Sequence, residues 1–290
     1  MAGFADDNQL YLTFKPSSAD DMTEIVALTE IMACIDAVRK WMLQHKLKIN
    51  DAKTEFLIIG NDPQLEKVNI DYVRVGSECI SPVEKVRNLG VIFDENLSMK
   101  AHVANVCKKG FFQLYKLRQI RQYLDMESAE RLIHAFVSSH LDYGNAMLAG
   151  LPDDVLNKLQ RLQNAAAWML IQRPKDSSIT EILASLHWLP IKARISYKIN
   201  MLVYKCLNED GPQYLKELLV KRSDNNSRLD NSDLLVVPKI KCSTFGGRSF
   251  RYVAPVEWNK LSPQLRKSKT LVIFKRDLKT ELFIRSYFIA

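Results

Sequence analysis

The sequence predicts an α+β protein in which a mixed segment precedes a long helical one. The first 95 residues contain short runs of strand formers around one long amphipathic segment. From Ser98 onward, apolar residues recur every three or four positions for more than 100 residues. The composition, 47% hydrophobic and 26% charged over 290 residues, is typical of a globular chain. We therefore expect an α+β layer at 1–97, a helical region at 98–222, a linker or long loop at 223–233 and a basic region at 234–290.

The N-terminal residues predict a β-hairpin whose tip carries two neighbouring carboxylates. The strand formers Leu10–Phe14 follow the turn-forming run ADDN, which contains Asp6 and Asp7. Only three residues precede Phe4, so we expect the first strand of this hairpin to be missing. An amphipathic helix is predicted next, from Asp21 to His45, because apolar side chains form one stripe along it. The members of this stripe are Met22, Ile25, Leu28, Ile31 or Met32, Ile35, Val38 and Met42.

Strands and further helices are predicted in the order of the chain. A strand at Glu55–Ile59 precedes a strand pair formed by Tyr72–Val75 and Val86–Phe93. The helical periodicity then predicts helices at Met126–Leu141, Val155–Ile171 and Ala193–Leu207. For residues 234–290 we expect short strands and a final helix over about 271–283. Trp188 and Trp258 are predicted to be core aromatics.

The net charge of +8 is unevenly distributed along the chain, with most of the basic excess near the C-terminus. Residues 1–60 hold 6 basic and 9 acidic side chains, whereas residues 237–290 hold 12 and 3. A basic excess permits binding to phosphate backbones, and the alternative is a solvated basic surface. We expect an intracellular chain without a membrane partner, because the sequence has neither a secretory signal nor a long uncharged apolar run. The five scattered cysteines lack zinc-site spacing and predict reduced, buried thiols.

Two adjacent carboxylates on a tight turn have a specific chemical use. Like charges a few Å apart repel each other unless a cation lies between them, and hard oxygen ligands suit Mg²⁺. A pair of such ions can hold an attacking hydroxyl, a phosphoryl group and leaving pyrophosphate in line. Asp6 and Asp7 are therefore candidate metal ligands, and the alternative is a solvated turn without a ligand.

Several sequence blocks resemble one protein family in their order and spacing. The blocks are GFADDNQLYLTF, WMLQHKLKIN, AKTEFLIIG and VRNLGVIFD, followed by AFVSSHLDYGNAMLAGLP, LQRLQNAAAW, LHWLPIKARISYKI and FGGRSFRYVAPVEWNKLSP. The first four are similar to the second half of the palm of reverse transcriptases from jockey-type non-LTR (LINE-like) retrotransposons. The others are similar to that family's C-terminal region. The resemblance covers nearly the whole chain and implies a partial right-hand polymerase palm followed by a helical thumb.

The resemblance also implies roles for individual residues. Asp6 and Asp7 match the motif that binds catalytic Mg²⁺ in an RNA-directed DNA polymerase, a nucleotidyltransferase. Lys53 matches a lysine that approaches the phosphates of the incoming nucleotide, and its alternative is an ordinary surface lysine. Leu89 and Gly90 match the hairpin that grips the primer end, and the alternative for the glycine is a bulge in a strand. The partners implied for the intact enzyme are an RNA template and a DNA primer.

One departure from the family pattern bears on activity. The family's palm needs another aspartate upstream of the FADD motif, and fingers that hold template and nucleotide; neither is present in these residues. We therefore expect that this chain, as a truncated fragment, does not synthesise DNA by itself. The alternatives are a nucleic-acid-binding remnant and a helical interaction protein without catalysis.

A basic run follows the predicted palm. Phe111, Phe112 and Tyr115 are interleaved with six cations and no acid. The cations, which are the candidate nucleic-acid contacts, are Lys100, Lys108, Lys109, Lys116, Arg118 and Arg121. Such a helical face could follow a nucleic-acid backbone with weak, sequence-independent affinity. The alternative places the apolar residues in the core and the lysines in water.

Overall fold

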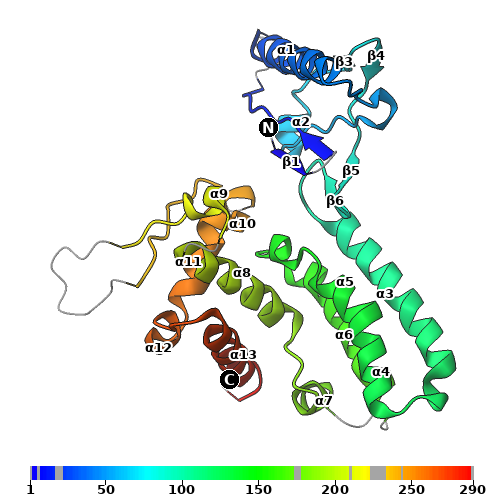
Figure 1. Ribbon diagram of the computed structural model, residues 1–290, viewed down its shortest axis with the longest axis vertical. Helices are drawn as coiled ribbons and strands as arrows, with labels where there is room; N and C mark the ends of the chain where they lie inside the picture. The colour runs from blue at the N-terminus through cyan, green and yellow to red at the C-terminus, as the bar shows by residue number, and fades with distance from the viewer. Residues whose placement is uncertain are drawn as a thin grey trace. The chain divides into compact units, whose positions relative to one another are not determined.

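The computed structural model describes residues 2–4, 7–16, 22–172, 178–208, 211–222, 233–242 and 244–288 (Figure 1). It divides into two compact units, Met1–His102 and Val103–Ala290. All six described strands, in three two-stranded antiparallel sheets, belong to the first unit, and the described part of the second unit is helical. The predicted α+β class is therefore confirmed.

The first hairpin differs from its prediction. Strand β1 (Ala2–Phe4) pairs with β2 (Asp7–Gln9), with Phe4 opposite Asp7. The expectation of a missing first strand is wrong, because three residues before the turn are enough to form a short antiparallel pair. Asp7 opens the second strand, whereas Asp6 lies outside the described residues.

Helix α1 (Met22–Gln44) confirms the predicted helix and packs on the second hairpin. Ala27, next to the predicted apolar stripe, is buried, but the residues of the stripe from Leu28 to Met42 are only half-buried. Ile25, a predicted member of the stripe, is 54% exposed. The Arg39 guanidinium forms an ion pair with Asp51 and thereby joins α1 to the short 3₁₀ helix η1 (Asp51–Lys53).

The remaining strands form two local hairpins. Strand β3 (Val73–Val75) pairs with β4 (Glu78–Ile80), and β5 (Lys85–Asn88) pairs with β6 (Val91–Asp94). The predicted pairing of 72–75 with 86–93 is wrong, because the chain turns at Leu89 and Gly90. Their φ angles of 45° and 84° are both positive, as a two-residue type I′ turn requires.

The predicted strand Glu55–Ile59 is not part of a ladder. Only Phe56 pairs, through a single bridge to Pro82 in which the Val83 N–H donates to the Phe56 carbonyl at 2.8 Å. Helix α2 (Asp62–Leu65) follows and is closed by a capping box at Asn61. The prediction of a regular strand here is wrong, because the segment pairs at one position only.

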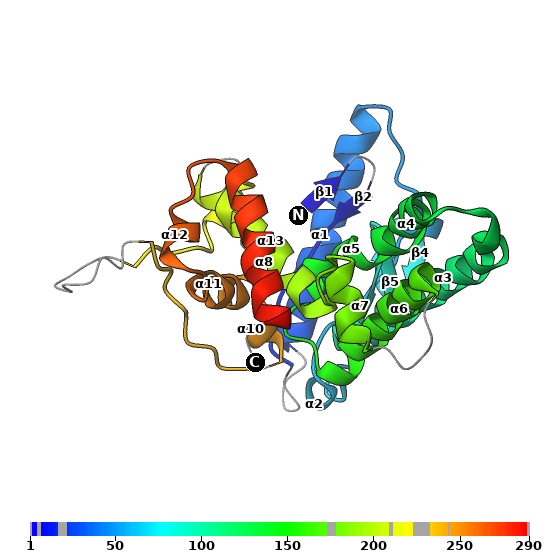
Figure 2. The same ribbon diagram turned by 90° about the horizontal axis from the view of Figure 1, so that it is seen from below.

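The second unit is a helical assembly around α8 (Ile191–Leu207), which contacts α5, α6, α11 and α13 (Figures 1 and 2). The helices that precede α8 are α3 (Lys100–Ile120, whose first turn belongs to the first unit), η2 (Arg121–Tyr123), α4 (Met126–Ile133), η3 (His134–Ser138, a π-helical turn), α5 (Ser139–Asp142), η4 (Asn145–Leu148), α6 (Asp153–Ile171) and α7 (Ile179–Ser185). The predicted helices at 155–171 and 193–207 are confirmed, and the one at 126–141 contains the π-helical turn. Leu162, Val203 and Phe274 are fully buried in the core of this unit.

The C-terminal part is helical, so the predicted short strands are wrong for its described residues. It contains α10 (Phe245–Arg248), α11 (Phe250–Asn259), α12 (Pro263–Arg266) and α13 (Leu271–Tyr287). Helix α13 confirms the predicted final helix. The short helix α9 (Gln213–Lys216) precedes this part of the chain. An isolated antiparallel bridge joins Lys221 to Leu235 on either side of residues 223–232, which lie outside the described residues. Trp188 and Trp258 are 5% and 2% exposed, as predicted for core aromatics.

The cysteines are free, but only Cys206 is buried. Cys34, Cys79 and Cys242 are exposed, so the prediction of buried thiols is wrong for these three. Among the described helices, none combines the length and the apolar character needed to cross a membrane.

Candidate nucleic-acid interface

Helix α3 has one face that the core of the second unit covers. Four apolar side chains on this face are buried, and they are three residues or about two helical turns apart. They are Val103, Val106, Leu114 and Leu117. Gly110 lies on the same face, and a Cβ added there would stand 2.3 Å from a methyl group of Leu162 on α6. The close approach of the two helices fixes which side of α3 faces solvent.

The opposite face of α3 carries aromatic side chains in solvent. Phe111, Phe112 and Tyr115 are 45%, 54% and 63% exposed. The alternative interpretation, in which the apolar residues of this run enter the core, is therefore wrong for the three aromatics, although it holds for Leu114 and Leu117. The Lys116 ammonium lies 4.5 Å from the centre of the Phe112 ring, within range of a cation–π interaction.

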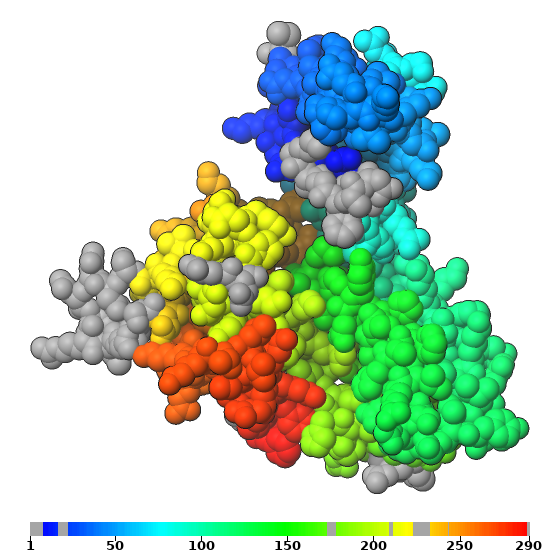
Figure 3. Space-filling model, viewed as in Figure 1, coloured from blue at the N-terminus to red at the C-terminus, as the bar shows by residue number. Residues whose placement is uncertain are grey.

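Cations alternate with these rings on the same surface. Lys108, Lys109, Lys116 and Arg118 are exposed and have no acidic partner among the residues that the structure describes. The helix itself contains five cations and no carboxylate. We call Lys108, Lys109, Phe111, Phe112, Tyr115, Lys116 and Arg118 the α3 face. Its helix forms part of the surface of the second unit (Figure 3).

Two of the predicted cations have different surroundings. Arg121 donates from its two terminal nitrogens to the carbonyl oxygens of Leu124 and Leu170, each at 2.8 Å. Because its guanidinium is engaged inside the fold, Arg121 is not part of the α3 face. Lys100 is exposed at the first position of α3. Just before this helix, the Asp94 carboxylate accepts hydrogen bonds from the backbone N–H and the hydroxyl of Ser98.

The remaining predicted contacts belong to the first unit. Leu89 and Gly90 form the tip of the β5–β6 hairpin, where the Leu89 side chain is 43% exposed. Lys53 is the exposed last residue of η1. The structure describes these residues as parts of the first unit, separately from the α3 face.

The predicted metal ligands are described only in part. Asp7 pairs through its backbone with Phe4, and Asp6 lies outside the described residues. Within the described ranges, no three His, Cys, Asp or Glu side chains gather as a metal site would require. The Mg²⁺ site therefore stays a prediction from sequence.

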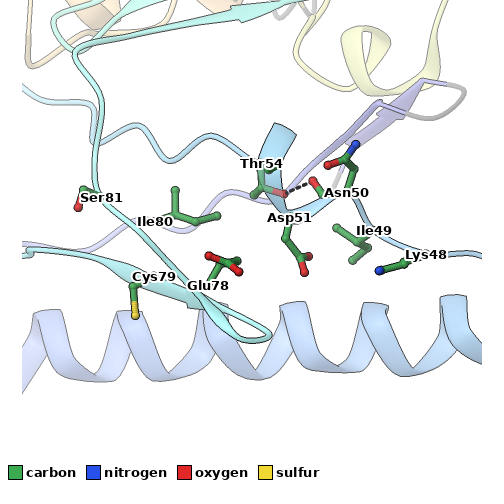
Figure 4. A pocket seen from close by; sticks show the side chains of 10 residues that line it. Lys48, Ile49, Asn50, Asp51, Thr54, Glu78, Cys79, Ile80 and Ser81 are labelled. Atoms are coloured by element: carbon green, nitrogen blue, oxygen red, sulfur yellow. Dashed lines mark hydrogen bonds between the residues drawn. The ribbon is translucent and has the colours of Figure 1, made fainter.

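A cleft of about 880 Å³ lies in the first unit between residues 48–54 and 78–81, beside α1 (Figure 4). Asp51 and Glu78 line it, but the Asp51 carboxylate is neutralised by Arg39. The Thr54 hydroxyl donates to the carbonyl of Asn50 at 3.2 Å. The cleft contains none of the predicted site residues, and its lining offers no nucleophile paired with a base.

The fold and the α3 face define an α+β chain whose helical unit presents an exposed surface of cations and aromatic rings. Comparison with models of protein families, with curated proteins and with solved structures found no match. Function is therefore argued from this surface and from the sequence.

Proposed function

We propose that the second unit binds nucleic acid through the α3 face, by contacts to the phosphate backbone and without sequence preference. The observation that carries this proposal is the exposure of Phe111, Phe112 and Tyr115 among cations that have no acidic partner within the described ranges. Aromatic side chains of this size are normally buried because each removes a large apolar area from water. Three of them exposed within five residues of a basic helix fit a surface on which bases stack.

The cations supply the sequence-independent part of the affinity. Each lysine or arginine that neutralises a phosphate releases condensed counterions, so the binding constant falls as salt rises. Four cations without described acidic partners can all be used for this purpose. The rings add stacking, which favours unpaired strands because their bases are accessible.

We further propose that the chain derives from the reverse transcriptase of a jockey-type non-LTR retrotransposon. The ordered sequence blocks support this origin, and the turn at Leu89–Gly90 is compatible with the primer-gripping hairpin that the resemblance implies. In the intact enzyme Asp6, Asp7 and Lys53 would serve the polymerase reaction with Mg²⁺, an RNA template and a DNA primer. These 290 residues alone should not extend a primer.

A salt titration tests the proposed interface. We expect the affinity for a single-stranded RNA to fall on a log–log plot against salt, with a slope of about −0.7 per phosphate contact. Replacing Lys108 and Lys116 with Gln should make the slope shallower by about 1.4. The control variant replaces the exposed Lys241 and Lys275, which lie outside α3, and should keep the slope of the unmodified chain.

Two further measurements separate this proposal from its alternatives. Replacing Phe112 and Tyr115 with Ala should weaken single-strand binding about tenfold or more, because each stacked base contributes about 1–3 kcal/mol. Affinity that did not change with salt would contradict phosphate binding and favour a protein partner. Primer extension with Mg²⁺ that disappeared in a D6A/D7A variant would contradict the expected inactivity.

A further inference from the structure

A second cleft lies entirely within the second unit and was not predicted from the sequence. It has a volume of about 460 Å³ and is lined from α4, the η3 and η4 turns, the loop 186–189, α8 and α13. This volume is within the range of small-molecule sites. The residues used below are Glu130, Asn145, Trp188, Arg194, Lys198 and Lys279.

One wall of the cleft is preorganised by an ion pair. Arg194 on α8 donates from Nε to Asp142 Oδ1 at 2.8 Å and from Nη2 to the other carboxylate oxygen. The paired guanidinium is partly buried, and its fork geometry holds both side chains in place. Asn145 Nδ2 also approaches Asp142 Oδ1, at 3.4 Å. These contacts orient the Arg194 and Asn145 side chains at the cleft.

The floor contains an unsatisfied acceptor. Asn145 is 3% exposed, and its Oδ1 is buried without a hydrogen-bond partner. A buried carbonyl oxygen without a donor is destabilising, and native structures leave few such atoms. Because Asn145 lines the cleft, a ligand that carries an N–H group could satisfy this oxygen.

Two cations and an aromatic side chain also line the cleft. Lys198 and Lys279 are exposed at the cleft, and neither has an acidic partner within the described part of the chain. Trp188 is 5% exposed, and its Nε1 donates to Glu130 at 3.3 Å. Its ring lies 5.3 Å from that of His134, centre to centre. The lining of the cleft thus combines a buried acceptor, an aromatic side chain and two exposed cations.

We propose that this cleft binds a nucleoside monophosphate group, with the base against Asn145 and the phosphate between Lys198 and Lys279. Nucleobase edges carry the N–H donors that Asn145 Oδ1 lacks, and the base plane suits an aromatic wall. A phosphate supplies the negative charge that the two lysines lack. The group could be a free nucleotide or one residue of a strand. This site is separate from the α3 face, so the two proposals can fail independently.

Calorimetric titration of the full chain tests the site. The probes are the four ribonucleoside monophosphates, the matching nucleosides, inorganic phosphate and a short single-stranded RNA. We expect at least one nucleotide to bind more tightly than phosphate and than its own nucleoside. Replacing Lys198 or Lys279 with Gln should weaken that binding about tenfold, the effect of losing one charged hydrogen bond. Lys275→Gln, which removes an exposed lysine one turn away on α13, should leave it unchanged.

Two more variants complete the test. Asn145→Ala should reduce the preference for nucleotide over phosphate, and because it could unfold the chain, its thermal unfolding is measured in parallel. The K108Q/K116Q variant should bind the nucleotide normally, which separates this site from the α3 face. Suppose that K108Q/K116Q binds RNA but no free nucleotide, and that a further substitution of Lys198 or Lys279 weakens this RNA binding. The cleft would then bind one nucleotide residue of an RNA strand. Absence of both kinds of binding, or phosphate binding as tightly as every nucleotide, would overturn the proposal.

Discussion

Arg121 and Lys116 belong to one basic run, yet the structure predicts different effects when each is replaced. Arg121 donates to two main-chain carbonyls, and Leu170 lies in the last turn of α6, where carbonyls lack helical partners. Arg121→Gln leaves both oxygens without these charge-assisted bonds. We expect it to lower the free energy of unfolding by about 2–3 kcal/mol. For a unit of this size, that corresponds to a melting temperature lower by about 4–12 °C.

Lys116 is exposed, its ammonium lies over the Phe112 ring, and it has no acidic partner among the described residues. Lys116→Gln should change the melting temperature little, because surface substitutions away from buried features have small effects. It should instead make the salt dependence of RNA binding shallower by about 0.7, whereas Arg121→Gln should leave this slope unchanged. Thermal unfolding by circular dichroism and fluorescence anisotropy at four salt concentrations measure the two quantities on both variants. The reasoning is refuted if Arg121→Gln flattens the salt slope without lowering the melting temperature.

Three other substitutions test local features of the structure. Gly110→Ala should destabilise the chain by about 1–3 kcal/mol in urea unfolding, because the new methyl group would overlap Leu162. The Asp125 carboxylate caps α4 by accepting a hydrogen bond from the Ser128 backbone N–H, and this bond lowers the pKa of Asp125. The stabilisation by this cap should therefore be present above the ordinary pKa of Asp and lost as the pH falls through the lowered value. Asp125→Ala should remove this part of the pH dependence of the melting temperature. A hydrogen bond with Thr244, 2.9 Å away, lowers the pKa of the Cys242 thiol to about 7, so alkylation of Cys242 should be fast at neutral pH and slower after Thr244→Val.

Each of these expectations has a contradicting result. Unchanged unfolding of Gly110→Ala would mean that α3 and α6 are further apart than described. An identical pH profile in Asp125→Ala would show that the cap makes no ionisable contribution. Equal alkylation rates with and without Thr244 would show that this hydroxyl does not stabilise the thiolate.

The long helices could be predicted from sequence because burial on one face imposes a spacing of three or four residues. In α6 and α8 the predicted positions, such as Leu159, Leu162 and Ile199, are buried. In α1 the same spacing is present, but the stripe is only half covered. Periodicity thus predicts that a helix forms, whereas the degree of burial depends on what packs against it.

Strand pairing and side-chain partners could not be predicted in the same way. The positive φ angles at Leu89 and Gly90 divide one apparent strand into a hairpin, and a leucine gives little signal for such a turn. Arg121 donates to the carbonyl of Leu170, which lies 49 positions further along the chain. The local sequence therefore could not show that Arg121 is engaged in the fold whereas Lys116 is exposed. The cleft around Asn145 draws on helices and loops from across the unit, and no motif marks it.

The bridge between Lys221 and Leu235 determines what would happen if the chain were cut between positions 223 and 232. Arg222 donates to Leu234 and Val236 donates to Val220, while the Asn259 side chain bonds both backbone groups of Leu235. Severing the peptide backbone in that interval would leave these contacts, together with the packing of α8 on α11 and α13, to hold the two pieces together. Two separately expressed fragments that meet in this interval should therefore be able to reassemble through these contacts.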